Sequence, residues 1–169
     1  MLKRHFVVGL FTLMMLLSVQ NIFASTISVQ IEQVDKLHND VTETTLLIEE
    51  SILEYLFSKG MIVSTCPIVV DSSTSQTGFA MALNDARSGY SDFLIYISVY
   101  FNPQKSEFSE KINIQNIDLA QWRIIRINDN KQTASGKLEP KKLQSTENPV
   151  FEITNFGIQI AASLNSSLK

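Results

Sequence analysis

The stretch from Gly89 to Phe101 constrains the fold more than any other, because its pattern predicts a long β-strand with two different faces. Side chains alternate along a strand, so one face carries only apolar residues: Phe93, Ile95, Ile97, Val99 and Phe101. The other face is amphipathic and partly aromatic, with Leu94, Tyr96, Ser98 and Tyr100. The apolar face must lie against a core, so we expect an interior strand of a sheet that helices cover.

The first 24 residues have the three parts of a secretory signal peptide. Lys3 and Arg4 precede an apolar run over residues 6–19, and Ala24 supplies the small residue before a cleavage site. This run has 14 residues, whereas a membrane-spanning helix needs about 20, so we favour cleavage over a membrane anchor. We expect residues 1–24 to be a signal peptide and 25–169 a single globular domain. The protein is then exported, periplasmic or secreted, with no membrane span after cleavage.

Charge and cysteine content exclude several classes of function. Without its first 24 residues the chain has 12 basic and 17 acidic groups, a net charge of −5. A chain of this kind lacks the basic patch that nucleic acids and membrane surfaces require, so we expect no nucleic-acid partner. Cys66 is the only cysteine, which rules out an internal disulfide. We favour a buried, inert thiol, with pairing between two chains as the alternative.

Three elements are predicted before the principal strand. Thr26–Val34 alternates apolar and polar residues, which predicts a strand with one buried side. Asp40–Lys59 predicts a long helix with a capping box of Asp40 and Glu43, a wide apolar face and a solvated acidic stripe. Met61–Val70 predicts a second strand. Since Pro67 lacks an N–H, that strand should lie at an edge or carry a bulge.

A short helix is predicted just before the principal strand, over Thr77–Ser88, with these residues inward: Phe79, Ala82, Leu83 and Ala86. After the principal strand, residues 112–128 predict one long or bulged strand, a tight turn follows at 128–131, and Gln132–Leu138 returns as a strand. Residues 140–147 are a predicted linker.

Asn148 and Pro149 are typical of a helix start, and they predict a last helix with an apolar seam of Ile153, Phe156, Ile160, Leu164 and Leu168. Gly157 beside that seam suggests close approach to a sheet. Together the elements predict an α/β fold: a mixed sheet of four to five strands with a long helix, a short helix and a C-terminal helix, in two or three layers.

Short motifs in this order resemble a recurrent domain of the bacterial envelope. They are Ala82 to Ala86, Gly89 to Leu94, and the hairpin segments Trp122–Ile125 and Gly136–Leu138. The chain resembles, over about residues 26–166, the amino-terminal domain of the Tol-Pal translocation protein, the curli secretion lipoprotein and the lipoprotein activators of penicillin-binding proteins. The resemblance implies an exported α/β domain with an accessory role.

The sequence offers little catalytic chemistry. His38, the only histidine after residue 24, lies in a polar turn with no Gly-x-Ser-x-Gly or reactive-cysteine context, so we expect a surface histidine. One histidine and one cysteine do not make a zinc site, and no glycine-rich phosphate loop is present, so we expect no metal and no cofactor. Asp85, Arg87 and Asp92 flank the turn at Gly89, where we favour a structural salt bridge over catalysis.

The partner-binding candidates are aromatic and arginine residues, the types enriched in binding hot spots: Tyr96, Tyr100, Trp122, Arg123 and Arg126. Tyr96 and Tyr100 share a face. The strand over 121–127 adds to it either Trp122, Ile124 and Arg126 or Arg123, Ile125 and Ile127. A helix that simply covers this face is the alternative.

The function expected from the sequence is that of a non-enzymatic exported accessory or adaptor domain. It would bind an envelope protein partner or a second copy of itself. A carrier of a small apolar or lipidic ligand is the first alternative, and a small hydrolase is the second.

Overall fold

The computed structural model describes residues 25–71, 75–103, 112–141 and 148–168. The signal peptide predicted over 1–24 and most of the linker predicted over 140–147 lie outside these residues, as does the whole segment 104–111. The described elements are β1 Thr26–Val34, α2 Glu43–Ser58, β2 Ile62–Thr65, β3 Val69–Asp71, α3 Ser75–Ser88, β4 Phe93–Phe101, the 3-10 turn η2 Ile114–Asn116, β5 Ile117–Arg126, β6 Lys131–Leu138 and α4 Pro149–Ser167.

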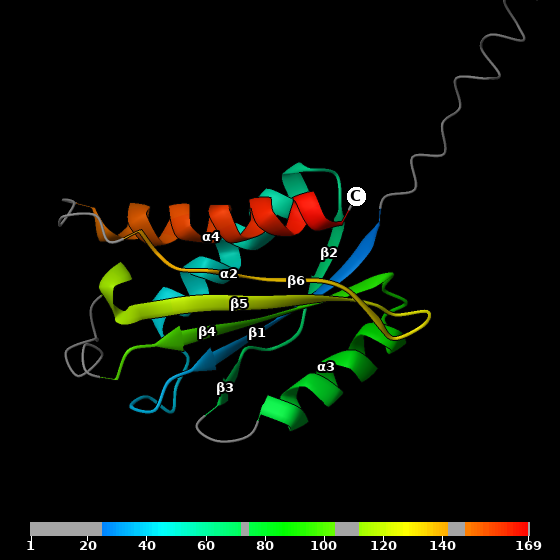
Figure 1. Ribbon diagram of the computed structural model, residues 1–169, viewed down its shortest axis with the longest axis horizontal. Helices are drawn as coiled ribbons and strands as arrows, with labels where there is room; N and C mark the ends of the chain where they lie inside the picture. The colour runs from blue at the N-terminus through cyan, green and yellow to red at the C-terminus, as the bar shows by residue number, and fades with distance from the viewer. Residues whose placement is uncertain (1–24, 72–74, 104–111, 142–147, 169) are drawn as a thin grey trace, which may run out of the picture.

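The elements form three layers around one mixed sheet (Figure 1). Helices α2 and α4 lie on one face of the sheet and α3 on the other. The strands follow the order β2-β1-β4-β5-β6, and β3 pairs with the second half of β1. The α/β prediction is confirmed. In the described part of the chain the sheet has six strands rather than four or five, because Met61–Val70 forms two short strands on either side of Pro67.

Strand β4 is the interior strand that the sequence predicted. It pairs in parallel with β1 along eight residues and antiparallel with β5 along its whole length. Its apolar face, with Ile95, Ile97 and Val99, is completely buried under α2 and α4. The rest of the fold is therefore arranged around β4, with a different helical layer on each of its faces.

Helices α2 and α4 pack closely against each other as well as against the sheet. Their buried apolar side chains are Ile48, Ile52 and Leu56 of α2 and Ile153, Phe156, Ile160, Ala161 and Leu164 of α4. The seam predicted for α4 is confirmed, and Asn148 caps the helix by accepting a hydrogen bond from the Phe151 N–H. The prediction for Gly157 was wrong: it approaches Ser51 and Ile48 of α2, not the sheet.

The amino-terminal end of α2 differs from the predicted capping box. Thr42 is the N-cap, and its side chain accepts a hydrogen bond from the Thr45 N–H at 3.3 Å. The prediction that Asp40 caps this helix was therefore wrong. The predicted apolar face was also too wide, since Leu46 is 48% and Phe57 74% exposed. Gly60 ends the helix with a φ of 81°, as expected of a C′ glycine.

Strand β1 is buried on both sides, although the sequence predicted one buried side. Ile27, Val29 and Ile31 face α2 and α4. The alternate residues Ser28, Gln30 and Glu32 are also buried, at 1–3% exposure. The physical reason is what packs over this face. Helix α3 contacts β1, and the segment between β2 and β3 covers Ser28 and Gln30, with Cys66 Sγ beside the Ser28 hydroxyl and the Pro67 carbonyl oxygen accepting a hydrogen bond from the Gln30 amide.

Helix α3 covers part of the face opposite α2 and α4. Its predicted inward residues contact Leu94, Tyr96 and Ile125 of the sheet: Phe79, Ala82, Leu83 and Ala86. The phenyl ring of Phe79 stands edge-on to the Tyr96 ring, with 5.3 Å between the centroids. The helix thus buries one end of this sheet face (Figure 1).

Candidate functional site

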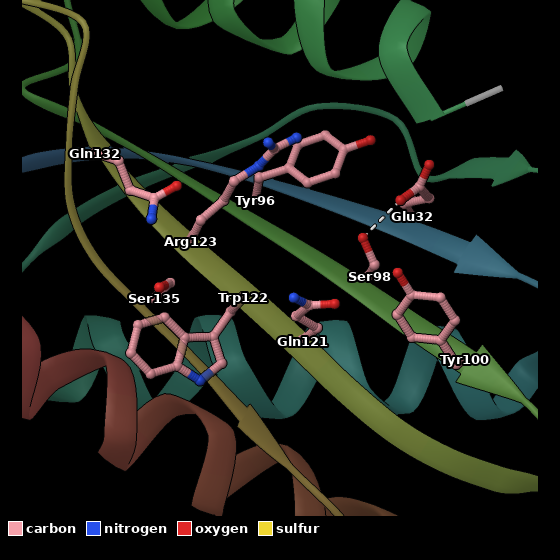
Figure 2. A pocket seen from close by; sticks show the side chains of 9 residues that line it. All are labelled: Glu32, Tyr96, Ser98, Tyr100, Gln121, Trp122, Arg123, Gln132 and Ser135. Atoms are coloured by element: carbon pink, nitrogen blue, oxygen red, sulfur yellow. Dashed lines mark hydrogen bonds between the residues drawn. The ribbon is translucent and has the colours of Figure 1, made fainter.

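A cleft of about 300 Å³ opens on the α3 side of the sheet, beyond the part that α3 covers. It is called the cleft below, and nine residues line it: Glu32, Tyr96, Ser98, Tyr100, Gln121, Trp122, Arg123, Gln132 and Ser135 (Figure 2). They come from four strands, β1, β4, β5 and β6. The site is therefore built on a rigid sheet rather than on loops.

The strand register arranges the floor of the cleft in rows that run across the sheet. One row pairs Ser28, Leu94 and Ile125, and it lies under α3. The next row is Gln30, Tyr96, Arg123 and Ser135, at the rim of the helix. The third row is Glu32, Ser98, Gln121 and Lys137, which is polar throughout. Side chains in such a row stand about 5 Å apart and act together.

Glu32 is the most unusual residue of the cleft because it is an acidic side chain that is only 1% exposed. Its Oε2 accepts a hydrogen bond of 2.6 Å from the Ser98 hydroxyl. Among the residues that the structure describes, its Oε1 has no hydrogen-bond partner, and no basic side chain forms an ion pair with it. Burying a carboxylate oxygen without a partner costs free energy, so this group calls for an explanation.

Arg123 supplies the opposite charge at the other end of the cleft. Its guanidinium lies 3.7 Å from the centroid of the Phe79 ring and 4.9 Å from that of the Tyr96 ring. These contacts hold the arginine in place by cation–π attraction. Within the described ranges it forms no ion pair with a carboxylate. Its N–H donors, which point outward in the plane of the group, are therefore not used by an acidic neighbour.

The close-up view separates the two charges (Figure 2). Glu32, Ser98 and Tyr100 gather at one end, and Arg123 lies with Tyr96 and Gln132 toward the other. Glu32 and Arg123 stand two strands apart in neighbouring rows. Two strand spacings of about 4.8 Å and one row of about 6.8 Å place the two backbone positions roughly 12 Å apart. The cleft is therefore bipolar, with an acidic end and a basic end.

The predicted partner-binding residues do not all come together. Tyr100 and Arg123 line the cleft and are partly exposed, while Tyr96 lines it but is only 2% exposed, because α3 covers it. The ring of Trp122 points to the other face, where it is 6% exposed in the main core (Figure 2). Arg126 lies outside the cleft and pairs with Asp129 at 3.4 Å.

Of the two sets offered for β5, the set with Arg123, Ile125 and Ile127 shares the face of Tyr96. The alternative interpretation was that a helix covers this face. Helix α3 does so, but only over part of the face. Glu32, Gln121, Gln132 and Ser135 were not predicted as site residues. The alternation of Thr26–Val34 did indicate that Glu32 shares one face of the strand with other polar residues. Only the pairing with neighbouring strands decides which side chains that face lies beside.

Other polar groups make contacts that stabilise the fold. The Asp35 carboxylate holds Nδ1 of His38 at 2.7 Å and also accepts a hydrogen bond from the Leu37 N–H, an arrangement typical of a turn. His38 is partly exposed in a turn, where the sequence placed it, and its carboxylate partner Asp35 was not predicted. Cys66 is buried, as expected, with its Sγ 3.5 Å from the Ser28 hydroxyl.

The cluster predicted at the Gly89 turn takes a different form from a salt bridge. Asp92 accepts hydrogen bonds from the N–H and the hydroxyl of Thr26, both at 2.8 Å. Arg87 donates to the side-chain oxygens of Asn84 and Asn130. In the described ranges no three His, Cys, Asp or Glu side chains gather as a metal site would require, and no helix is long and apolar enough to span a membrane.

The fold and the cleft define an α/β domain with a mixed sheet between two helical layers. The chain belongs to a protein family whose model matches residues 26–169 and whose description is "Uncharacterised protein". A comparison with curated proteins gave no match.

Several solved structures are similar to this chain at the level of fold. A PelC dodecamer from Paraburkholderia phytofirmans has 10% identity and a TM-score of 0.44, with 86% of this chain and 89% of that chain covered. TolB from Acinetobacter baumannii has 7% identity and a TM-score of 0.42, with 86% and 28% covered. The LpoB C-terminal domain from Salmonella enterica has 14% identity and a TM-score of 0.41, with 78% and 91% covered.

TolB and LpoB agree with the envelope-protein resemblance that the sequence indicated, as a weak similarity of fold. A likeness of this degree carries no argument about partner or activity.

Proposed function

We propose that this protein is a non-enzymatic accessory protein of the bacterial cell envelope, exported by the signal peptide predicted over residues 1–24, and that it binds a protein partner in the cleft. One observation carries the proposal. Helix α3 stops short of the row formed by Glu32, Ser98 and Gln121, so a cleft remains on this face of the sheet. Tyr100, Gln121 and Arg123 are accessible in this cleft, and the buried Glu32 forms part of its wall.

The composition of the cleft supports a protein partner. Arginine and tyrosine are enriched among the residues that dominate binding energy in protein interfaces. Arg123 and Tyr100 are both partly exposed here, and neither has to leave the core to make contact. A second copy of the chain is one possible partner of this kind.

A carrier of an apolar or lipidic ligand is less well supported. Ligand pockets for small molecules have volumes of about 300–1,000 Å³ and mostly apolar walls. The cleft is lined chiefly by polar and charged side chains. The apolar hollow beside Phe151 and Phe156 has a volume of only about 80 Å³. Mass spectrometry of the purified native protein tests this alternative, because a carrier retains its ligand.

Site-specific photocrosslinking in cells tests the proposal. A benzophenone amino acid replaces Gln121 in the cleft or, as the control, the exposed Gln159 on α4 at the other side of the molecule. Ser135→Trp fills the cleft from the exposed edge strand β6, and Ser166→Trp adds the same bulk at the exposed end of α4.

We expect one defined protein adduct from position 121 that disappears with Ser135→Trp and persists with Ser166→Trp. Equal adducts from positions 121 and 159, or an adduct that survives Ser135→Trp, would show that the cleft is not the binding surface.

A further inference from the structure

We propose that the cleft recognises a lysine side chain of the partner, whose ammonium group pairs with Glu32, and an acidic group of the same segment, which pairs with Arg123. This inference rests on the proposed function, because it names the chemistry of the segment that enters the cleft.

The first step is that Glu32 lacks a cation. A buried carboxylate is usually paired, since the ionised group loses its hydration without compensation. Ser98 satisfies one oxygen of Glu32, and the other has no partner in the described part of the chain although the side chain lines the cleft. Neutral polar residues, Ser28 and Gln30, occupy the two preceding positions on the same face. The described part of the fold thus offers Glu32 a hydroxyl but no cation, and a cationic group of a ligand would supply the missing partner.

The second step is that one ammonium group fits better than a metal ion or a guanidinium group. Calcium takes six to eight oxygen ligands, and the described residues offer no cluster of three acidic or metal-binding side chains. Arginine prefers two parallel hydrogen bonds to both oxygens of a carboxylate, but Oε2 of Glu32 already accepts from Ser98. An ammonium group is a compact point charge that needs only Oε1 and can also lie against the ring of Tyr100.

The third step concerns the other end of the cleft. Arg123 is fixed by two aromatic rings and has no carboxylate partner among the described residues. A segment that brings only a cation would leave the Arg123 guanidinium unpaired, and the two positive charges would repel each other. A segment with a carboxylate roughly 12 Å from its ammonium group satisfies both ends, given that Glu32 and Arg123 lie two strands and one row apart.

Calorimetric titration of the purified protein with short peptides tests the inference. The probe is acetyl-Lys-Gly-Glu-amide. Its two controls replace lysine by norleucine, which has the same chain length without the charge, or glutamate by glutamine. The protein variants are Glu32→Gln, which keeps the shape of the side chain, and Glu54→Gln on the exposed acidic stripe of α2.

We expect binding of the probe by the natural chain and by Glu54→Gln, and a loss of about tenfold or more in affinity with Glu32→Gln or with the norleucine peptide. The glutamine peptide should bind more weakly as well. The norleucine comparison uses only the natural chain, so it is decisive even if Glu32→Gln folds poorly.

Equal binding of the lysine and norleucine peptides, or no binding of either, overturns the inference. A crosslink that stays confined to position 121 in the same protein would then leave the proposed function intact. Crosslinks that form equally from position 159 would remove the proposed function itself.

Discussion

Replacement of Gly157 by alanine tests how closely α2 and α4 pack. A Cβ atom at this position would lie 2.7 Å from Cβ of Ser51 and 3.1 Å from the carbonyl oxygen of Ile48. Carbon atoms in good contact lie about 3.5–4.0 Å apart, so the two helices must separate by roughly 1 Å. The Ile48 oxygen belongs to the backbone and cannot turn away.

Two effects oppose each other in Gly157→Ala. Alanine in a helix interior is favoured over glycine by about 1 kcal/mol. Overpacking of a well-packed interface costs typically about 1–3 kcal/mol. Because the contact involves a backbone atom and a Cβ rather than the end of a flexible side chain, we expect the clash to prevail. The net loss of unfolding free energy should be up to about 2 kcal/mol.

Urea unfolding followed by circular dichroism measures this loss, and a double-mutant cycle with Ser51→Gly isolates its cause. Ser51→Gly removes the closest atom, so Gly157→Ala should cost less in that background than in the natural chain. The coupling should be about 1 kcal/mol, with incomplete recovery because the Ile48 oxygen stays in place. A Gly157→Ala variant that is more stable than the natural chain, or strictly additive effects, would refute the close approach.

Two further predictions concern α2. Thr42→Ala should lower the unfolding free energy by about 1 kcal/mol, since it removes the N-cap. Asp40→Ala should change the unfolding free energy by less than about 0.5 kcal/mol. Urea midpoints that fall equally in the two variants would contradict this assignment of the cap. Burial raises the pKa of the Glu49 carboxyl above its ordinary value of 4.5, so the folded state binds this proton more tightly. The stability that the proton contributes is present below the unfolded pKa and is lost as the pH rises through the folded pKa. Glu49→Gln should therefore be more stable than the natural chain near pH 7 and equal to it below about pH 4, and a difference that grows on acidification would contradict this sign.

The elements with a strong periodic pattern were predictable from sequence. Phe93–Phe101 alternates without interruption and is observed with those bounds as β4. Asn148 and Pro149 start α4 as predicted, because the cap and the fixed φ of proline act locally. The start of α2 was not predictable in this way. Thr42 is selected as the cap together with Gln33 of β1, whose Oε1 accepts hydrogen bonds from the N–H of Thr42 and the hydroxyl of Thr45.

The cleft shows more clearly that contacts between distant segments of the chain cannot be predicted from local sequence patterns. Tyr100 and Arg123 were predicted from residue type, and both line it. Trp122 was predicted on the same grounds, but the register of β5 turns its ring to the opposite face of the sheet, into the core. Glu32 was missed because its face is decided by pairing with β4, more than sixty residues further along the chain. Residue type thus indicated the chemistry of the site, and long-range register decided which side chains share it.

The most direct test of the cleft as a binding site is a nuclear magnetic resonance titration of the isotope-labelled protein with the lysine- and glutamate-containing tripeptide. We expect the backbone amide signals of Glu32, Ser98, Gln121 and Arg123 to shift together, and those of Glu50 and Glu54 on the acidic stripe of α2 to stay unchanged. Shifts that gather on α2, or the absence of shifts in the cleft, would contradict the account.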